Sequence, residues 1–231
     1  MWPLNRTVDK LIAAIMVALS LAAVAQGDPV YSFYNFRKPS DTLGSQFYMQ
    51  VSDAGSVGGV NRVAFKFWND LAAPGAIASS ICDIYFDDGT LLGIASITNS
   101  GPGVSFSASA TPGNLPGGNQ ASPPFQVTKD FSADSNSPQL SQNGVNAIGE
   151  WVTITFNLIN GKTYADTLAA LANGQDLRVG LHVQAIGRTG RSDSYINGGT
   201  TPNGGMIPAP GAFVLALIGL GLISRLRSRL N

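Results

Sequence analysis

The chain has few of the residues that usually perform catalysis or bind metals. Its 231 residues include one histidine, His182, one cysteine, Cys82, and one glutamate, Glu150. A single cysteine can form no disulfide within the chain, so the stability of the fold must come from its hydrophobic core. The motifs of serine hydrolases, zinc proteases and phosphate-binding loops are also absent from the sequence. We therefore expect no enzymatic activity and no bound cofactor.

Charged residues are also scarce, at 12% of the chain, and 14 basic residues balance 14 acidic ones. Five of the basic residues and one of the acidic residues lie in the two terminal segments described below. This leaves 9 basic and 13 acidic residues between those segments, a net charge of −4. Nucleic acid is not an expected partner, because binding it requires clustered Lys and Arg.

The first 25 residues have the pattern of a secretory signal peptide. Arg6 and Lys10 precede an apolar run at 11–24, and small residues, Ala23 and Ala25, occupy the two positions that a signal peptidase recognises. We expect cleavage after Ala25 and export of the remaining chain. A retained N-terminal anchor is the alternative.

The last 26 residues, 206–231, combine a proline pair, a short apolar run and an arginine cluster. Their order is Pro208, Ala209, Pro210 and Gly211, then the apolar residues 212–223, then Arg225, Arg227 and Arg229. About 12 apolar residues extend ~18 Å as a helix, which is short for a hydrocarbon core of ~30 Å. Long arginine side chains can reach the headgroup layer, so the pattern predicts a marginal anchor with a cytoplasmic C-terminus.

These three features, in this order at the end of a chain, resemble the PEP-CTERM sorting signal of Gram-negative and related bacteria. The resemblance implies that an exosortase recognises and processes residues 206–231 after a transient stay in the inner membrane. It also implies delivery of the protein to the cell surface or to an exopolysaccharide matrix. Ala209 departs from the pattern, because the family usually has glutamate there. An ordinary C-terminal anchor and a buried helix of the domain are the alternatives.

The region between the termini, 26–205, has the periodicity of an all-β domain. Alternating apolar and polar residues predict strands at 31–38, 46–51, 60–68, 77–86, 91–97, 104–108, 125–131, 150–158, 177–185 and 193–196. One helix is predicted, with Thr163 as its N-cap, Asp166 completing a capping box and Gly174 ending it. These elements predict an antiparallel β-sandwich, jelly-roll-like, with one short helix.

Two features of this region predict how the strands are connected. The strands 77–86 and 91–97 are predicted to form a hairpin around Asp87, Asp88 and Gly89, an acidic turn with glycine between two apolar runs. The stretches 111–124 and 132–146 are rich in polar and turn-forming residues and are predicted to be exposed loops. The segments 83–89, 103–106 and 114–119 also resemble a body type that recurs among PEP-CTERM proteins, and this resemblance implies no particular activity.

The candidate metal ligands are three aspartates, Asp83, Asp87 and Asp88. Their carboxylates could supply the oxygen ligands that calcium prefers, although the spacing differs from that of an EF-hand loop. Favourable turn chemistry explains Asp87 and Asp88 equally well. Cys82 is predicted to share one face of its strand with the apolar residues Ile84 and Phe86, and is expected to be a small buried residue.

The other candidates are two tryptophans and the histidine. Trp68 and Trp151 could stack on sugars, as exposed aromatic rings of β-sandwiches can, or could pack against neighbouring loops. His182 lies on the outward face of its predicted strand and would need a nucleophile and a carboxylate to act as a general base. A surface role for His182 is the simpler interpretation.

The sequence therefore predicts a non-enzymatic exported protein of the cell surface or exopolysaccharide matrix, with an exosortase as its processing partner. A carbohydrate-binding module of that matrix, which binds polysaccharide with or without calcium, is the alternative function. A secreted hydrolase that uses His182 and an aspartate is the third hypothesis.

Overall fold

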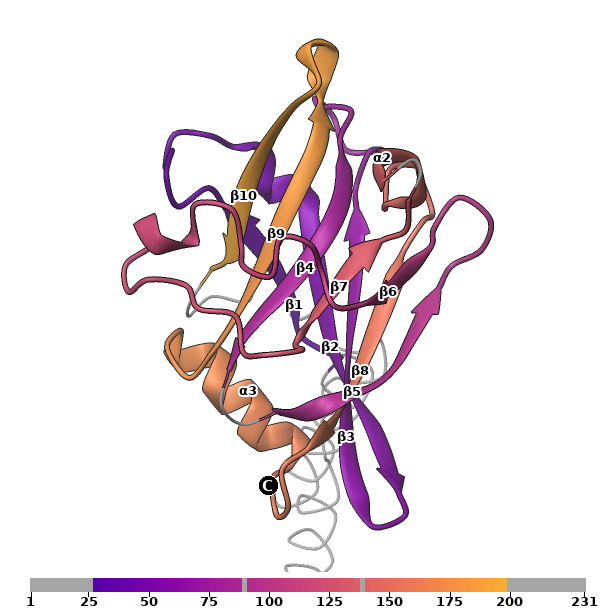
Figure 1. Ribbon diagram of the computed structural model, residues 1–231, viewed down its shortest axis with the longest axis vertical. Helices are drawn as coiled ribbons and strands as arrows, with labels where there is room; N and C mark the ends of the chain where they lie inside the picture. Colours follow the sequence, from indigo (N-terminus) through magenta and orange to yellow (C-terminus); the bar gives the residue numbers. More distant parts are fainter. Residues whose placement is uncertain (1–26, 89–90, 138–139, 199–231) are drawn as a thin grey trace, which may run out of the picture. The chain divides into compact units, whose positions relative to one another are not determined.

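The architecture is an antiparallel β-sheet that curls until it nearly closes on itself (Figure 1). A computed structural model describes residues 27–88, 91–137 and 140–198. The prediction of a mostly antiparallel all-β fold is confirmed. The described residues from Asp28 onward belong to one compact unit. The predicted signal peptide at 1–25 and sorting segment at 206–231 lie outside the described residues.

The described residues contribute a 10-stranded sheet in the order β5-β8-β3-β2-β1-β10-β9-β4-β7-β6. The strands are β1 (Val30–Tyr34), β2 (Phe47–Val57), β3 (Val60–Asn69), β4 (Ser80–Asp88), β5 (Leu91–Asn99), β6 (Phe106–Ala108), β7 (Ser132–Ser135), β8 (Val152–Leu158), β9 (Leu177–Ile186) and β10 (Arg191–Asn197). We call β2, β3, β8 and β5 the β3 half, and β10, β9, β4, β7 and β6 the β9 half. Strand β1 pairs with both β2 and β10 and so joins the two halves.

The core lies between the two halves. Period-two alternation buries Val152, Ile154, Phe156 and Leu158 of β8, as predicted, and the inward residues of the other long strands behave in the same way. Phe86 of β4 packs against Phe65 of β3 and Phe156 of β8, with ring centroids 5.1 and 4.7 Å away. These edge-to-face contacts connect strands that do not pair with each other, and thus hold the two halves together.

The predicted helix is confirmed as α3 (Tyr164–Asn173). Thr163 and Asp166 form the reciprocal capping box, with the Thr163 N–H donating to Asp166 Oδ2 at 2.8 Å. Gly174 ends the helix with a positive φ of 65°, the left-handed conformation that glycine adopts without strain. The described residues also contain short helical turns: α2 (Leu140–Asn143), η1 (Leu43–Gln46), η2 (Gly118–Gln120) and η3 (Gly187–Thr189).

The predicted hairpin of strands 77–86 and 91–97 is wrong. Strand β4 lies between β9 and β7, whereas β5 lies at the far end of the sheet beside β8. Asp87, which was assigned to the turn, continues β4 and pairs with Arg178 of β9. The local turn signal was overridden because both strands find longer partners elsewhere in the sheet, where their apolar faces are buried.

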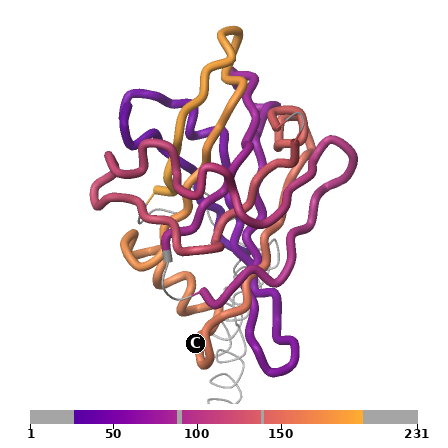
Figure 2. The backbone as a smooth tube through the Cα atoms, viewed as in Figure 1, coloured from indigo at the N-terminus to yellow at the C-terminus, as the bar shows by residue number. Residues whose placement is uncertain are grey.

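The prediction of a loop at 111–124 is confirmed, and most of its residues are exposed, but three of them are buried. Residues 109–131, which we call the cover segment, cross the outer face of the β9 half (Figure 2). Leu115 and Phe125 of this segment are buried against Tyr85 and Ile196 on that face. The predicted edge strand 125–131 is irregular, and the short strand β7 follows it inside the stretch 132–146 that was predicted to be loop. The cover segment gives the β9 half a second apolar layer.

A glycine and an arginine on the outward face of β9 allow the cover segment to lie close to the sheet. A Cβ on Gly180 would lie 2.8 Å from the Leu115 side chain, so a larger residue would displace the segment. Arg178 donates to the carbonyl oxygens of Pro123 and Pro124 at 2.6 and 2.7 Å. The same guanidinium forms an ion pair with Asp87 of β4, so Arg178 connects the cover segment to both β9 and β4.

Candidate functional site

The outer face of the β3 half carries a row of three aromatic side chains. Tyr48 of β2 lies directly opposite Trp68 of β3, and their rings stack with centroids 5.3 Å apart and an interplanar angle of 21°. Phe67 of β3 is paired with Val152 of β8 in antiparallel orientation. Trp151, the residue before β8, therefore lies across from Trp68 in the same register. All three rings are partly exposed. We call Tyr48, Trp68 and Trp151 the aromatic row.

A β-bulge determines that Tyr48 meets Trp68. Strands β2 and β3 are joined by a tight turn at Gly58 and Gly59, and counting back from it without interruption would place Tyr48 opposite Asn69. The register shifts by one residue between Asp53 and Ser56, where Gly55 has a positive φ of 72°. This shift places both aromatic rings on the outer face of the sheet.

Trp151 is held in place by backbone and cationic contacts. The Trp151 N–H donates to Ser100 Oγ at 3.1 Å, and the Ser100 N–H donates to the Trp151 carbonyl oxygen at 3.0 Å. The Lys66 ammonium lies 4.8 Å from the centre of the Trp151 ring, within the range of a cation–π contact. The ring is thus oriented before any ligand binds.

A surface hollow of about 370 Å³ is bordered by both tryptophans. It is lined by Trp68, Trp151, Lys66, Gln50, Asp70 and Ile148, among others. Its volume is within the range of ordinary ligand sites, which is about 300–1,000 Å³. We call it the tryptophan hollow. It combines two aromatic rings with amide, ammonium and carboxylate groups, a combination suited to a ligand that has both apolar and hydroxyl-bearing faces.

A second hollow of about 330 Å³ lies on the other side of Tyr48. It is lined by Tyr48, Ser32, Thr42, Ser45, Pro74 and Ile77, among others. We call it the serine hollow. The same chain segment borders both hollows, since residues 70–72 line the tryptophan hollow and residues 73–77 line the serine hollow.

Two buried amides fix the segment 70–77 that borders both hollows. Gln46 donates to the Ile77 carbonyl oxygen at 2.9 Å and accepts from the Ile77 N–H at 3.0 Å. Asn69 accepts from Gln46 Nε2 at 2.7 Å and donates to the Ser79 carbonyl oxygen at 2.9 Å. A buried, satisfied network of this kind gives the wall one conformation.

The candidate calcium ligands are not gathered into one site. Asp83 and Asp87 face the same side of β4, but they are four residues apart, ~13 Å along a strand, whereas calcium–oxygen distances are about 2.5 Å. Asp83 contacts His182, and Asp87 is paired with Arg178. The side chain of Asp88 lies outside the described part of the structure. Across residues 27–88, 91–137 and 140–198, no group of three or more His, Cys, Asp or Glu side chains is arranged to hold a metal ion.

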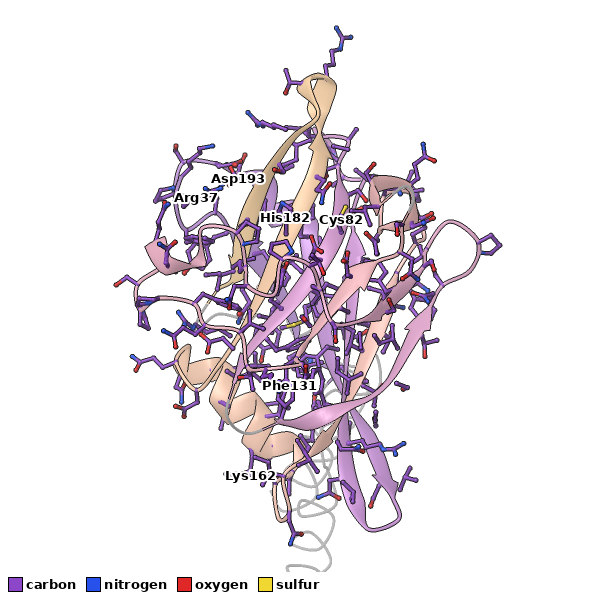
Figure 3. The ribbon with its side chains drawn as sticks, in the orientation of Figure 1. Arg37, Cys82, Phe131, Lys162, His182 and Asp193 are labelled. Atoms are coloured by element: carbon purple, nitrogen blue, oxygen red, sulfur yellow. The ribbon has the colours of Figure 1, made fainter. Side chains whose placement is uncertain are left out.

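His182 faces outward from β9, as predicted, but its side chain is only 13% exposed (Figure 3). Its Nδ1 lies 2.6 Å from Asp83 Oδ2. On the other side, Ser194 of β10 is directly opposite His182, and this serine is fully buried. A serine that a substrate cannot reach offers no nucleophile, so this row of residues gives no support to the hydrolase hypothesis.

Asp134 of β7 lies beside Asp83 in the same register. Burial raises the pKa of Asp134 to about 6, and the hydrogen bond and negative charge of the neighbouring Asp83 act in the same direction. Cys82, in the bulge of β4, is fully buried, and burial raises the pKa of its thiol to about 11. The prediction that Cys82 is a buried residue is confirmed.

Sequence reasoning identified Trp68 and Trp151 but missed Tyr48, Lys66 and the two hollows. The alternation in β2 does indicate that Tyr48 faces outward, because Phe47 and Met49 face the core. Its partner could not be assigned without the bulge.

Comparison with protein-family models and with curated proteins finds no match to this sequence. The helices in the described part of the chain are too short or too polar to cross a membrane.

Proposed function

We propose that this chain is an exported, non-enzymatic protein that binds carbohydrate through the aromatic row and the adjoining hollows. The observation that carries the proposal is the alignment of Tyr48, Trp68 and Trp151 on one solvent-facing side of the sheet. The C–H face of a sugar ring is apolar and stacks on aromatic rings, while its hydroxyl groups need polar partners. The tryptophan hollow offers both.

The arrangement in space supports binding more than a purely structural role for these rings. Tryptophans that serve only to cover a core are buried by their neighbours, whereas Trp68 and Trp151 remain partly exposed at the border of a hollow. The outer face of the β9 half is covered by its own chain, and the outer face of the β3 half is not covered in this way by the cover segment. The β3 half therefore offers the accessible binding surface.

The finer description of the fold is part of the proposal. We infer that the β3 half and the β9 half are the two layers of an antiparallel, jelly-roll-like β-sandwich. The packing of Phe86 onto Phe65 and Phe156 supports two facing layers with side chains interdigitating between them. The binding face is then the outer surface of one layer.

The expected effect of removing either tryptophan is a loss of carbohydrate binding. Trp68→Ala and Trp151→Ala should each weaken binding about tenfold or more, because central aromatic anchors commonly contribute over 1 kcal/mol to binding. The measurement is binding to a panel of purified plant, algal and bacterial polysaccharides, followed by calorimetry on those retained. Tyr34→Ala is the matched control, since Tyr34 is an exposed aromatic residue outside both hollows. Unchanged binding in both tryptophan variants, or no binding across the panel, contradicts the proposal.

Export and sorting rest on the two terminal segments. The signal-like residues 1–25 and the PEP-CTERM-like residues 206–231 support delivery through the inner membrane to the cell surface or the extracellular matrix, with an exosortase as partner. Mass spectrometry of both termini should find a mature form that begins at Gln26. It should also find the C-terminal residues beyond about Pro210 removed only in hosts that possess the exosortase. A tail that stays intact in either host would indicate an ordinary anchor.

A further inference from the structure

The tryptophan hollow and the serine hollow share one wall. Trp68 lines the first, Tyr48 lines the second, and the two rings are stacked against each other. The segment 70–77 runs along both. The stacked pair is therefore a ridge with a hollow on each side, and a ligand that fills both hollows must pass over the ridge.

The hollows follow one another across the strands. Ser32 of β1 is directly opposite Tyr48, Tyr48 is directly opposite Trp68, and Trp151, the residue before β8, follows in the register of the pair Phe67 and Val152. Neighbouring strands lie ~4.8 Å apart, so the row from Ser32 to Trp151 extends ~14 Å. One sugar ring is shorter than this row, whereas a few linked rings are long enough to cover it.

The lining groups favour an uncharged chain. The serine hollow is lined by hydroxyl, amide and apolar groups, with no charged residue among the described residues that border it. The tryptophan hollow contains one cation, Lys66, and two acids, Asp70 and Glu150. Glu150 accepts from the N–H groups of Asn146 and Ala147, both at 2.8 Å, so its charge is already partly compensated.

This charge pattern separates a neutral glycan from other chains that stack on aromatic rings. Single-stranded nucleic acids also use aromatic platforms, but their backbone requires a groove lined with several cations. Strongly anionic polysaccharides carry a similar density of charge. Lys66 alone, beside Asp70 and Glu150, does not provide the several cations that such an anionic chain needs.

We propose that the occupant of this face is a linear, uncharged polysaccharide chain that crosses the stacked pair Tyr48 and Trp68 and places consecutive sugar units in the two hollows. The proposal deepens the proposed carbohydrate-binding function and rests on it. The tryptophan hollow holds one end of the bound stretch between two rings. The serine hollow holds the other end through hydroxyl groups and the outer face of Tyr48.

The test is the dependence of affinity on chain length. Full-length protein is titrated by calorimetry with gluco-, xylo- and manno-oligosaccharides of one to six units. Affinity should rise at least about tenfold between the shortest and the longest members of the series that binds, and then level off. Ser45→Leu and, separately, Ser32→Leu place bulk in the serine hollow, and each should abolish that rise while leaving the weak binding of the shortest oligosaccharides unchanged. Trp151→Ala should weaken binding of every length.

The outcomes distinguish the two proposals. If no oligosaccharide binds and the parent polysaccharides are not retained, the proposed function fails. If binding depends on Trp68 and Trp151 but is equal for one unit and for six, only the extended occupant is overturned. Tighter binding of polygalacturonate or single-stranded DNA than of the neutral series, at low salt, also overturns it. A length dependence that disappears in both serine variants supports it.

Discussion

Replacing Phe86 with alanine is expected to lower the free energy of unfolding by about 3–5 kcal/mol, which is the usual cost of truncating a buried phenylalanine. Phe86 is fully buried and comes from β4. It contacts Phe65, Phe67 and Phe156, which belong to the opposite half of the sheet. No covalent crosslink can compensate, because Cys82 is the only cysteine. Urea unfolding, followed by tryptophan fluorescence and far-UV circular dichroism, measures the change.

Phe86→Leu is the control for this prediction. Leucine keeps most of the buried apolar volume and should cost less than half as much as alanine. If alanine and leucine destabilise the protein equally, or if the alanine variant loses less than about 1 kcal/mol, then Phe86 does not connect the two halves as described. The Phe86→Ala variant should also unfold as one cooperative unit, because the core is continuous across both halves.

The second large effect on stability is expected at Asp193 of β10, whose carboxylate binds Arg37 and Lys38 in the loop that follows β1. Its carboxylate accepts from Lys38 Nζ at 3.0 Å and from the Ser194 N–H at 3.0 Å, and it forms an ion pair with Arg37 (Figure 3). The carboxylate is only 4% exposed. Asp193→Ala should cost roughly 2–3 kcal/mol, because hydrogen bonds to a charged group are lost while both cations can turn to water.

The same residue predicts a loss of stability in acid. Burial alone raises the pKa of Asp193, but hydrogen bonds from Lys38, Arg37 and the Ser194 N–H outweigh it and lower the pKa to about 2. Because the folded-state pKa lies below the ordinary value of 3.8, the stabilisation is complete above about pH 5 and disappears as the pH falls towards 2. The stability difference between wild type and Asp193→Asn should therefore be largest near neutral pH and shrink below pH 4.

Asp28→Asn is the matched control for Asp193→Asn, because Asp28 is an exposed aspartate near the start of the described chain. It removes the same charge without removing buried contacts, so its stability should follow that of the wild type from pH 7 to pH 3. Denaturant unfolding at each pH provides the comparison. A constant difference between wild type and Asp193→Asn over this range would mean that the ion pair does not stabilise the fold.

Local chemistry was sufficient to predict the helix and the long amphipathic strands. The capping box of Thr163 and Asp166 and the stop at Gly174 are contacts within one turn of chain, and they form as predicted. The alternation in β8 needs only one buried and one exposed face, and both exist in any layered all-β fold.

Pairing between distant strands was not predictable in this way. Asp87, Asp88 and Gly89 have the composition of a hairpin turn, yet β4 and β5 belong to different parts of the sheet. Likewise, Leu115 lies in a stretch that has the composition of a solvent-exposed loop, and Phe125 begins the predicted edge strand 125–131. They are buried only because the outer face of β4 and β9 offers Tyr85 and a glycine, Gly180, for them to pack on.

The candidate binding face was likewise predictable only in part from the sequence. The sequence by itself determined that Trp68 and Trp151 are available for an outer face, since their neighbours alternate inward. Only the tertiary structure decided that Tyr48 joins them, because a one-residue bulge at Gly55 changes the register of β2 against β3. Side-chain direction along a strand has a period of two that each segment carries in its own residues. Which residues of two strands face each other depends on their register, a property of the pair that neither segment specifies alone.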